Sequence, residues 1–189
     1  HQARIWQDAG LHLRVAVNVS MDNLGSLEFP DFVARAADKA GVSPTSLVLE
    51  VTESRLMKDP LAALDILTRL RLKHIGLSID DSGTGHSSLA QLRDIPFDEL
   101  KVDRGFVHGA CRDASLRAIF EASLGMARQL GMKTVAEGVE DQEDWDCLRA
   151  SGCDMAQGYF IAKPMPAADL AGWITQWEAR YSKLAASET

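Results

Sequence analysis

Six short apolar runs recur along the chain, and nearly every one finishes on a polar residue. Each run is five or six residues long and is bounded by turn or capping residues, as β-strands are. The predicted strands cover 13–18, 47–51, 75–80, 99–103, 133–137 and 155–159. The polar residues at or near their ends are Asn18, Glu50, Asp80, Lys101, Glu137 and Gln157.

The segments between these runs have helical periodicity. Apolar residues at helical spacing predict helices over 32–40, 61–70, 116–130 and 143–150. Glycine follows three of these segments as a stop signal, and Pro60 opens the second one. A further helix contains His1 and stops before Gly10. Strand and helix thus alternate without a linker, which predicts a parallel sheet with helical crossovers.

Two arrangements of such a sheet are compatible with this alternation. An open doubly wound sheet concentrates its ligand at one switch point, usually beside a glycine-rich phosphate loop. A (β/α) barrel brings the C-terminal ends of all its strands to one mouth, where polar residues at most strand ends would meet. The sequence therefore favours an α/β fold of the TIM-like (β/α) barrel type, with six of about eight strands visible. Two strands are expected before His1.

Composition and charge narrow the class of partner. The 189 residues are 46% hydrophobic and 25% charged, which suits one globular domain, 1–189. The formal net charge of −7 argues against a nucleic-acid polymer as partner, but a small anionic ligand is compatible with metal ions that screen the repulsion. No apolar run approaches the ~20 residues needed to span a bilayer. A cytoplasmic location is expected, either for a protein free in the cytoplasm or for the cytoplasmic part of a membrane-anchored protein.

The cysteines and histidines of the chain do not form a metal-binding motif. Three cysteines, an odd number without metal-ligand spacing, are predicted to be reduced thiols of a cytosolic protein: Cys111, Cys147 and Cys153. Three histidines without metal spacing are interpreted as ordinary surface or loop residues: His74, His86 and His108. Three tryptophans in the C-terminal helical segments are interpreted as core packing: Trp145, Trp173 and Trp177.

Carboxylates gather at two neighbouring strand ends. Strand alternation points Glu50 and Thr52 to the same side, and Glu53 follows as the chain enters a loop. Asp80 and Asp81 close the next strand before a glycine-rich turn. Adjacent carboxylates repel each other unless a cation lies between them. Oxygen ligands select hard ions such as Mg²⁺ or Mn²⁺, and two such ions can act on both sides of a phosphoryl displacement.

Lys101 and Asp103 lie two residues apart on one predicted strand and are expected to face the same side, where the lysine would hold a water or a phosphate oxygen. Each feature also has a simpler interpretation: a solvated loop glutamate, a helix cap or turn at Asp80 and Asp81, an exposed strand lysine. The combination at consecutive strand ends favours a divalent-metal site that cuts a phosphate ester.

At these residues the chain resembles the EAL-domain family of cyclic di-GMP phosphodiesterases, over essentially its whole length. The matching elements are Asn18 in Val-Asn-Val-Ser, Leu-Glu-Val-Thr-Glu-Ser at 49–54, Asp80-Asp81, Lys101-x-Asp103, Ala-Glu-Gly-Val-Glu at 136–140, and Gln157-Gly158-Tyr159. The resemblance implies hydrolysis of cyclic di-GMP to linear pGpG by a homodimer that binds two Mg²⁺ or Mn²⁺ ions.

The resemblance also assigns roles to individual residues. The metal ligands would be Asn18, Glu50, Asp80, Asp81 and Glu137. Lys101 and Glu137 would be catalytic, the lysine near the catalytic water and the glutamate as the base. Gln157 and Asp103 would contact the substrate, and Glu53 would anchor the loop after Asp81.

Two departures from the family pattern bear on activity. The Glu-Ala-Leu signature is expected upstream of His1, so the domain is expected to be incomplete at its N-terminus. Ser82 and His86 stand where the family usually has Phe and Tyr, in a loop that couples dimerisation to metal binding. The alternative to the enzyme is a catalytically inactive EAL-like receptor for cyclic di-GMP. A sensor, receiver or GGDEF domain is expected to precede the domain in the full-length protein.

Overall fold

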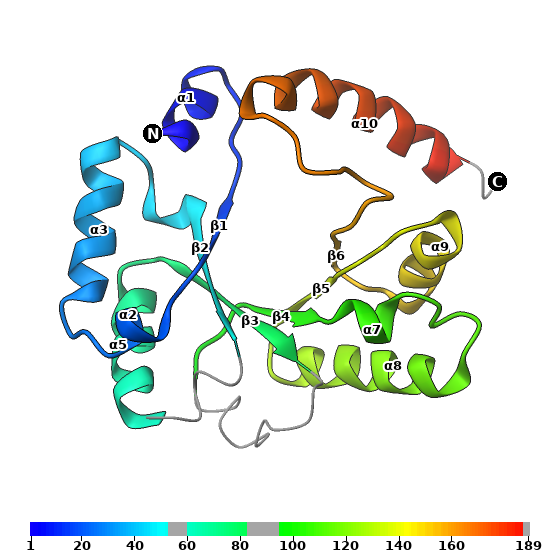
Figure 1. The fold of residues 1–189 in the computed structure, drawn as a ribbon, viewed down its shortest axis with the longest axis horizontal. Coiled ribbons are helices and arrows are strands. Elements are labelled where there is room, and N and C mark those ends of the chain that lie inside the picture. The colour runs from blue at the N-terminus through cyan, green and yellow to red at the C-terminus, as the bar shows by residue number, and fades with distance from the viewer. Residues whose placement is uncertain (53–59, 83–94, 187–189) are drawn as a thin grey trace.

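The chain forms a curled, all-parallel six-stranded sheet with helices around its outside (Figure 1). The computed structural model describes residues 1–52, 60–82 and 95–186. The strands are β1 (Val15–Asn18), β2 (Leu47–Thr52), β3 (Gly76–Ser82), β4 (Glu99–Val102), β5 (Lys133–Ala136) and β6 (Met155–Ala156). Each pairs with the next in chain order. This half-barrel confirms the predicted TIM-like α/β fold.

Helices lie between consecutive strands, as expected for parallel pairing, except between β3 and β4, where residues 83–94 are outside the described part of the chain. The described helices are α1 (Gln2–Asp8), α2 (Met21–Leu24), α3 (Phe29–Ala40), α5 (Pro60–Leu72), α7 (Arg104–Val107), α8 (Ala114–Gln129), α9 (Gln142–Ser151) and α10 (Leu170–Ala186). Short 3₁₀ turns occupy Pro44–Ser46 and Ala167–Asp169. All the predicted helices are present. None of the helices in the described part of the chain has the length and apolarity to cross a membrane.

Local sequence signals explain where these helices start and stop. Asp113 and Asp141 accept hydrogen bonds from the first backbone N–H groups of α8 and α9. Gly41 and Gly152 end α3 and α9 with φ of 64° and 70°, a conformation that glycine adopts without strain. These caps confirm the stop signals that the sequence predicted.

The core lies between the outer face of the sheet and the helices. Leu49, Val51, Leu77 and Ile79 are buried there against the apolar face of α5. Strand alternation therefore turns Glu50, Asp80 and Lys101 toward the inner face. A second cluster packs Val102 and Ala136 against α8 and α9 and includes Trp145, whose ring lies 5.7 Å from that of Trp177. The tryptophans are packing residues, as predicted.

The last strand is shorter than predicted. The sequence indicated a strand over 155–159, but pairing stops at Ala156. Gly158 lies directly on the backbone of Val139, and the Phe160 N–H donates to the Val139 carbonyl oxygen at 2.9 Å. The chain turns at this contact, so it cannot continue along β5.

The prediction of three reduced cysteines is wrong for two of them. Cys111 and Cys147 form a disulfide, while Cys153 is a free, half-buried thiol. The two bonded cysteines are 36 residues apart in sequence. They meet because the loop after α7 packs against α9, a long-range contact that cysteine spacing does not reveal.

Candidate active site

A buried lysine holds three carboxylates together at the C-terminal ends of the strands. The Lys101 Nζ atom lies 2.6 Å from an oxygen of Glu137, 3.1 Å from one of Glu50 and 3.5 Å from one of Asp80. Lys101 is 4% exposed, and the three acids are partly buried around it. The structure thus brings together four of the residues that the sequence predicted for the site.

The strand register explains this convergence. Glu50 lies beside Ser78 in the β2–β3 pair, so Asp80 is one inward-facing position further along β3. Lys101 is on β4 between β3 and β5, and Glu137 directly follows β5. The curl of the sheet tilts these side chains toward the long arm of Lys101. Three neighbouring strands and the residue that follows a fourth therefore supply one charged cluster.

The cluster shifts the ionisation of both of its central groups. Burial lowers the pKa of Lys101, but the hydrogen bond and charge of Glu137, with the charges of Glu50 and Asp80, outweigh burial and raise this pKa to about 12. Burial raises the pKa of Glu137, and the contact with Lys101 offsets part of that rise. Lys101 is therefore a permanent cation at neutral pH, and the raised pKa of Glu137 makes its carboxylate a better proton acceptor than an ordinary glutamate.

Asn18 and Gln157 lie at the borders of this cluster. Asn18 pairs in register with Glu50 at the end of β1 and is exposed. The Gln157 N–H donates to the Ala136 carbonyl oxygen at 2.8 Å, which fixes Gln157 beside Glu137. A cavity of about 300 Å³ there is lined by Arg104, Glu137, Gly138, Glu140, Gln157, Gly158 and Tyr159. It adjoins the charged cluster, with which it shares Glu137.

Arg104 is the lining residue that the sequence analysis missed. Its guanidinium pairs with Glu140 at 2.7 Å, and its side chain is 62% exposed at the cavity. The signal was present in sequence: Arg104 immediately follows Lys101-x-Asp103, and Glu140 closes the 136–140 motif. The periodicity of the sequence did not predict that Arg104 and Glu140 meet, because the segments that contain them are brought together by the pairing of β4 with β5.

The other predicted site residues have different positions. Asp103 lies beyond the end of β4 and caps α7, its Oδ1 accepting the Gly105 N–H at 2.7 Å. Asp81 is in β3, but its side chain lies outside the described residues. Glu53 and His86, and the side chain of Ser82, also lie outside them.

The donor chemistry of the cluster fits a hard divalent metal. Three carboxylates face one ammonium group, so the cluster carries excess negative charge in a partly buried position. Oxygen donors of this kind are the ligands that Mg²⁺ and Mn²⁺ prefer. An amide oxygen is available next to them at Asn18.

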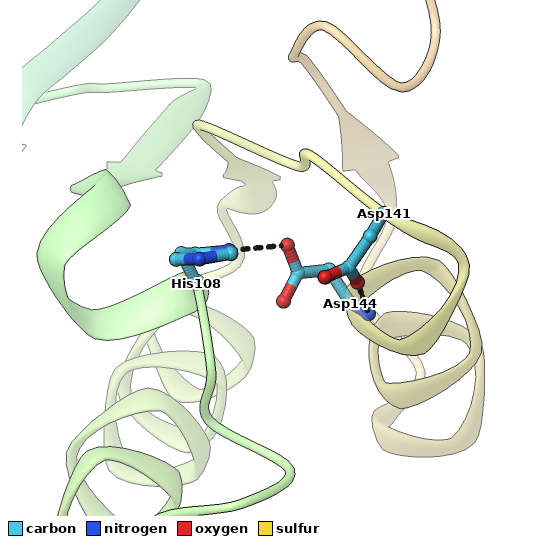
Figure 2. Close-up of side chains that lie close together, drawn as sticks. All are labelled: His108, Asp141 and Asp144. Atoms are coloured by element: carbon cyan, nitrogen blue, oxygen red, sulfur yellow. Dashed lines mark hydrogen bonds and ion pairs between the residues drawn. The ribbon is translucent and has the colours of Figure 1, made fainter.

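A second group of polar side chains lies outside this cluster, where α7 meets α9. Figure 2 shows His108 at the end of α7 pointing toward Asp144, with Asp141 beside it. The His108 Nδ1 atom lies 2.8 Å from Asp144 Oδ2, and Asp144 also accepts the N–H groups of Gly109 and Glu140 at 3.0 Å each. His108 was interpreted as an ordinary surface or loop residue. It does lie in the loop that follows α7, and its contact with Asp144 links this loop to α9.

Fold and site together define an α/β barrel-type domain with an acidic mouth at its strand ends. Residues 1–164 match the model of the EAL domain family, and the chain belongs to that family. The family resemblance seen in the sequence is thus confirmed.

Sequence relatives carry this domain within longer proteins. The chain is 41% identical over 170 residues to MucR of Pseudomonas aeruginosa, named a bifunctional diguanylate cyclase/cyclic di-GMP phosphodiesterase. It is 44% identical over 158 residues to NbdA of the same organism, named a cyclic di-GMP phosphodiesterase. These matches cover 89% and 84% of the chain, but 25% of MucR and 20% of NbdA.

Solved structures share the fold closely. A structure titled PaMucR phosphodiesterase, c-di-GMP complex, superposes with a TM-score of 0.84 at 41% identity, covering 89% of this chain and 69% of that one. Klebsiella pneumoniae BlrP1 gives a TM-score of 0.78 at 28% identity, covering 86% of this chain and 42% of that one. The BlrP1 structures are complexes with cyclic di-GMP and either calcium or manganese.

Proposed function

We propose that this domain hydrolyses one phosphodiester bond of cyclic di-GMP and releases linear pGpG. The observation that carries the proposal is the buried Lys101 ammonium held among Glu50, Asp80 and Glu137 at the mouth of the half-barrel. The names of MucR and NbdA support the same substrate and reaction.

The residues proposed to hold metal are Asn18, Glu50, Asp80, Asp81 and Glu137. Their oxygen atoms would bind Mg²⁺ or Mn²⁺, with two ions expected. When bound, such ions would polarise the phosphodiester and lower the pKa of a water molecule at the site.

Lys101 and Glu137 have complementary roles in this proposal. A lysine whose pKa is raised to about 12 does not act as a base at neutral pH. Lys101 instead donates hydrogen bonds that orient the attacking water and stabilise negative charge as it develops. Glu137 accepts the proton of that water, because burial raises the pKa of its carboxylate.

Substrate contacts are proposed for Gln157 and Asp103. The side chain of Gln157 borders the cavity beside Glu137, where its amide can bind a polar edge of a guanylate. Asp103 Oδ1 accepts a backbone N–H of α7, which fixes the orientation of this carboxylate near the same mouth. Glu53 is proposed to anchor the loop after Asp81.

The assembly around the domain is part of the proposal. We infer a homodimer and a fusion to an upstream regulatory domain, in the cytoplasm. The small share of MucR and NbdA that the chain spans supports the fusion. Sedimentation of the full-length protein tests the dimer, and a monomer at all concentrations would contradict it.

The decisive test is chromatography of cyclic di-GMP after incubation with the full-length protein. We expect linear pGpG with Mg²⁺ or Mn²⁺, and binding with little turnover with Ca²⁺, which tolerates irregular coordination. Glu50→Gln is expected to abolish turnover, whereas Glu28→Gln, at an exposed position before α3, should leave it unchanged. Tight binding of an intact nucleotide with both activating metals would identify a receptor instead.

A further inference from the structure

Two loops at the mouth are tied together by side chains outside the charged cluster. The first, residues 103–113, includes the short helix α7 and follows the strand of Lys101, and the second, residues 137–141, follows the strand that leads to Glu137. Arg104 pairs with Glu140 at 2.7 Å, and His108 contacts Asp144, in the first turn of α9, at 2.8 Å (Figure 2). These contacts hold the two loops in one arrangement.

The disulfide adds a covalent link to the same pair of elements. Cys111 lies in the first loop, and Cys147 lies in α9, one helical turn after Asp144. Their Cα atoms are 5.9 Å apart, which is within the range that a disulfide spans without backbone movement. The disulfide and the His108–Asp144 contact therefore lie in the same interface, between residues 103–113 and α9.

This interface contacts the backbone that follows Glu137. Asp144 accepts the Glu140 N–H at 3.0 Å, and the side chain of Arg104 covers Gly138. Glu137 is next to Gly138 in the chain, and its carboxylate reaches Lys101 at 2.6 Å. A continuous path of contacts thus runs from the first loop and α9 through residues 138–140 to this carboxylate.

We propose that Cys111 and Cys147 form a thiol–disulfide switch, whose oxidised form locks Glu137 against Lys101 and whose reduced form releases it. The catalytic consequence rests on the proposed function. The modification itself and the release of the loop do not. The reductant is a dithiol.

The exchange chemistry fits the surroundings of the two sulfurs. Cys111 is half-buried and Cys147 is buried, so a dithiol thiolate attacks Cys111 Sγ. The neighbouring Arg112, 57% exposed, pairs with Asp141 at 3.6 Å and with Glu143 at 3.4 Å, so its guanidinium does not cover Cys111. Cys147 leaves as a thiolate and takes up a proton, and the second thiol of the reagent then displaces Cys111. Two electrons pass to the protein disulfide, giving two thiols, and the dithiol becomes a cyclic disulfide.

The experiment compares the full-length protein with Cys111→Ser, Cys147→Ser and the matched control Cys153→Ser, each after mild oxidation and after dithiothreitol. Peptide mass spectrometry with thiol alkylation reports the redox state of each cysteine. Hydrogen–deuterium exchange reports the backbone of residues 137–141. Turnover of cyclic di-GMP is measured on the same samples.

We expect reduction of the wild type to raise exchange in residues 137–141 by about tenfold and to lower kcat by about three- to tenfold. Both serine variants of the bonded pair should match the reduced state in either buffer, and Cys153→Ser should respond as the wild type does. The switch is overturned if the bond does not form in the oxidised protein, if it resists dithiothreitol in the folded state, or if exchange in 137–141 does not change. A change in exchange without any turnover keeps the switch and rejects the proposed function.

Discussion

At the scale of single residues, the charge on Lys101 determines how the site is held. One ammonium group balances part of the charge of Glu50, Asp80 and Glu137 in a position with little solvent. Removing one partner of a buried ion pair leaves an uncompensated charge, which usually costs more than the pair itself contributes. Lys101 is therefore expected to be needed for stability as well as for chemistry.

Replacing Lys101 by Met tests this double role. We expect kcat to fall by about 100-fold or more while KM changes little, because the proposed contact with the water strengthens in the transition state. The metal-free protein should lose about 3–5 kcal/mol of unfolding free energy. Steady-state kinetics and urea titration measure the two effects. Lys39→Met, at an exposed position in α3, is the control, and an unchanged kcat in Lys101→Met would remove the lysine from the mechanism.

The contact between His108 and Asp144 makes stability depend on pH. The hydrogen bond to Asp144 raises the pKa of His108, and the charges of Asp144, Glu140 and Asp141 add to the rise despite partial burial. Burial raises the pKa of Asp144, but its bonds to His108 and to the N–H groups of Glu140 and Gly109 outweigh this and lower it.

The directions of the two pKa shifts define the pH range in which each group stabilises the fold. A raised histidine pKa stabilises the fold fully below about pH 6.5, and the gain is lost as pH rises through the raised value. A lowered aspartate pKa stabilises above about pH 3.9, and the gain is lost as pH falls. Melting temperatures between about pH 5 and 9 should therefore decline less steeply at the alkaline end in His108→Gln. His12→Gln, at an exposed position, should keep the wild-type profile. Identical profiles of His108→Gln and the wild type would contradict the assignment of this pH dependence to His108.

At the scale of elements, Gly158 sets the position of β6 and its turn against β5. A Cβ atom at this position would overlap the backbone of Val139, so the two segments approach more closely than any other residue allows. The same contact holds Gln157 beside Glu137, because the Val139 N–H donates to the Gln157 carbonyl oxygen at 3.1 Å.

Gly158→Ala should force these segments apart. We expect a loss of about 1–3 kcal/mol in unfolding free energy, as for other overpacked sites, together with reduced turnover. Gly172→Ala is a matched control, since a Cβ there meets no atom within 4 Å and alanine favours the helix by up to about 1 kcal/mol. Thermal melts of both variants and the wild type measure these effects. A melting temperature of Gly158→Ala equal to that of the wild type would show that the close approach is not required.

The elements also show what the sequence can and cannot predict. Alternation placed all six strands and predicted that Glu50, Asp80, Lys101 and Glu137 would meet, because parallel strands end at one edge. It also predicted that Asp103 shares the side of Lys101, but the chain leaves the strand at Val102, and Asp103 caps a helix instead. The disulfide and the Arg104–Glu140 pair join segments that are distant in sequence, so no local pattern predicts them.

At the scale of the whole molecule, negative charge governs the encounter with the ligand. The chain has a formal net charge of −7, and its mouth collects three acids around one lysine. A nucleotide with two phosphates is repelled by this mouth unless cations intervene. Divalent ions are thus expected to control binding before they contribute to hydrolysis.

Salt dependence distinguishes this repulsion from ordinary anion binding. After removal of divalent ions with EDTA, affinity for cyclic di-GMP should fall, and the residual affinity should improve as monovalent salt rises, because screening weakens the repulsion over about 10 Å at 0.1 M. Equilibrium dialysis at low and moderate salt measures the trend. An affinity that falls as salt rises in EDTA would instead point to a basic binding surface.

The chain-order pairing of the strands has a consequence for how the domain is synthesised. Each strand joins the edge formed by its predecessor, so the sheet can grow in one direction as the chain leaves the ribosome. On that path β2 and β3 bring Glu50 and Asp80 together before β4 has been made. The nascent sheet then carries two neighbouring acids without their lysine, and their repulsion is relieved when β4 brings Lys101 between them and Glu137.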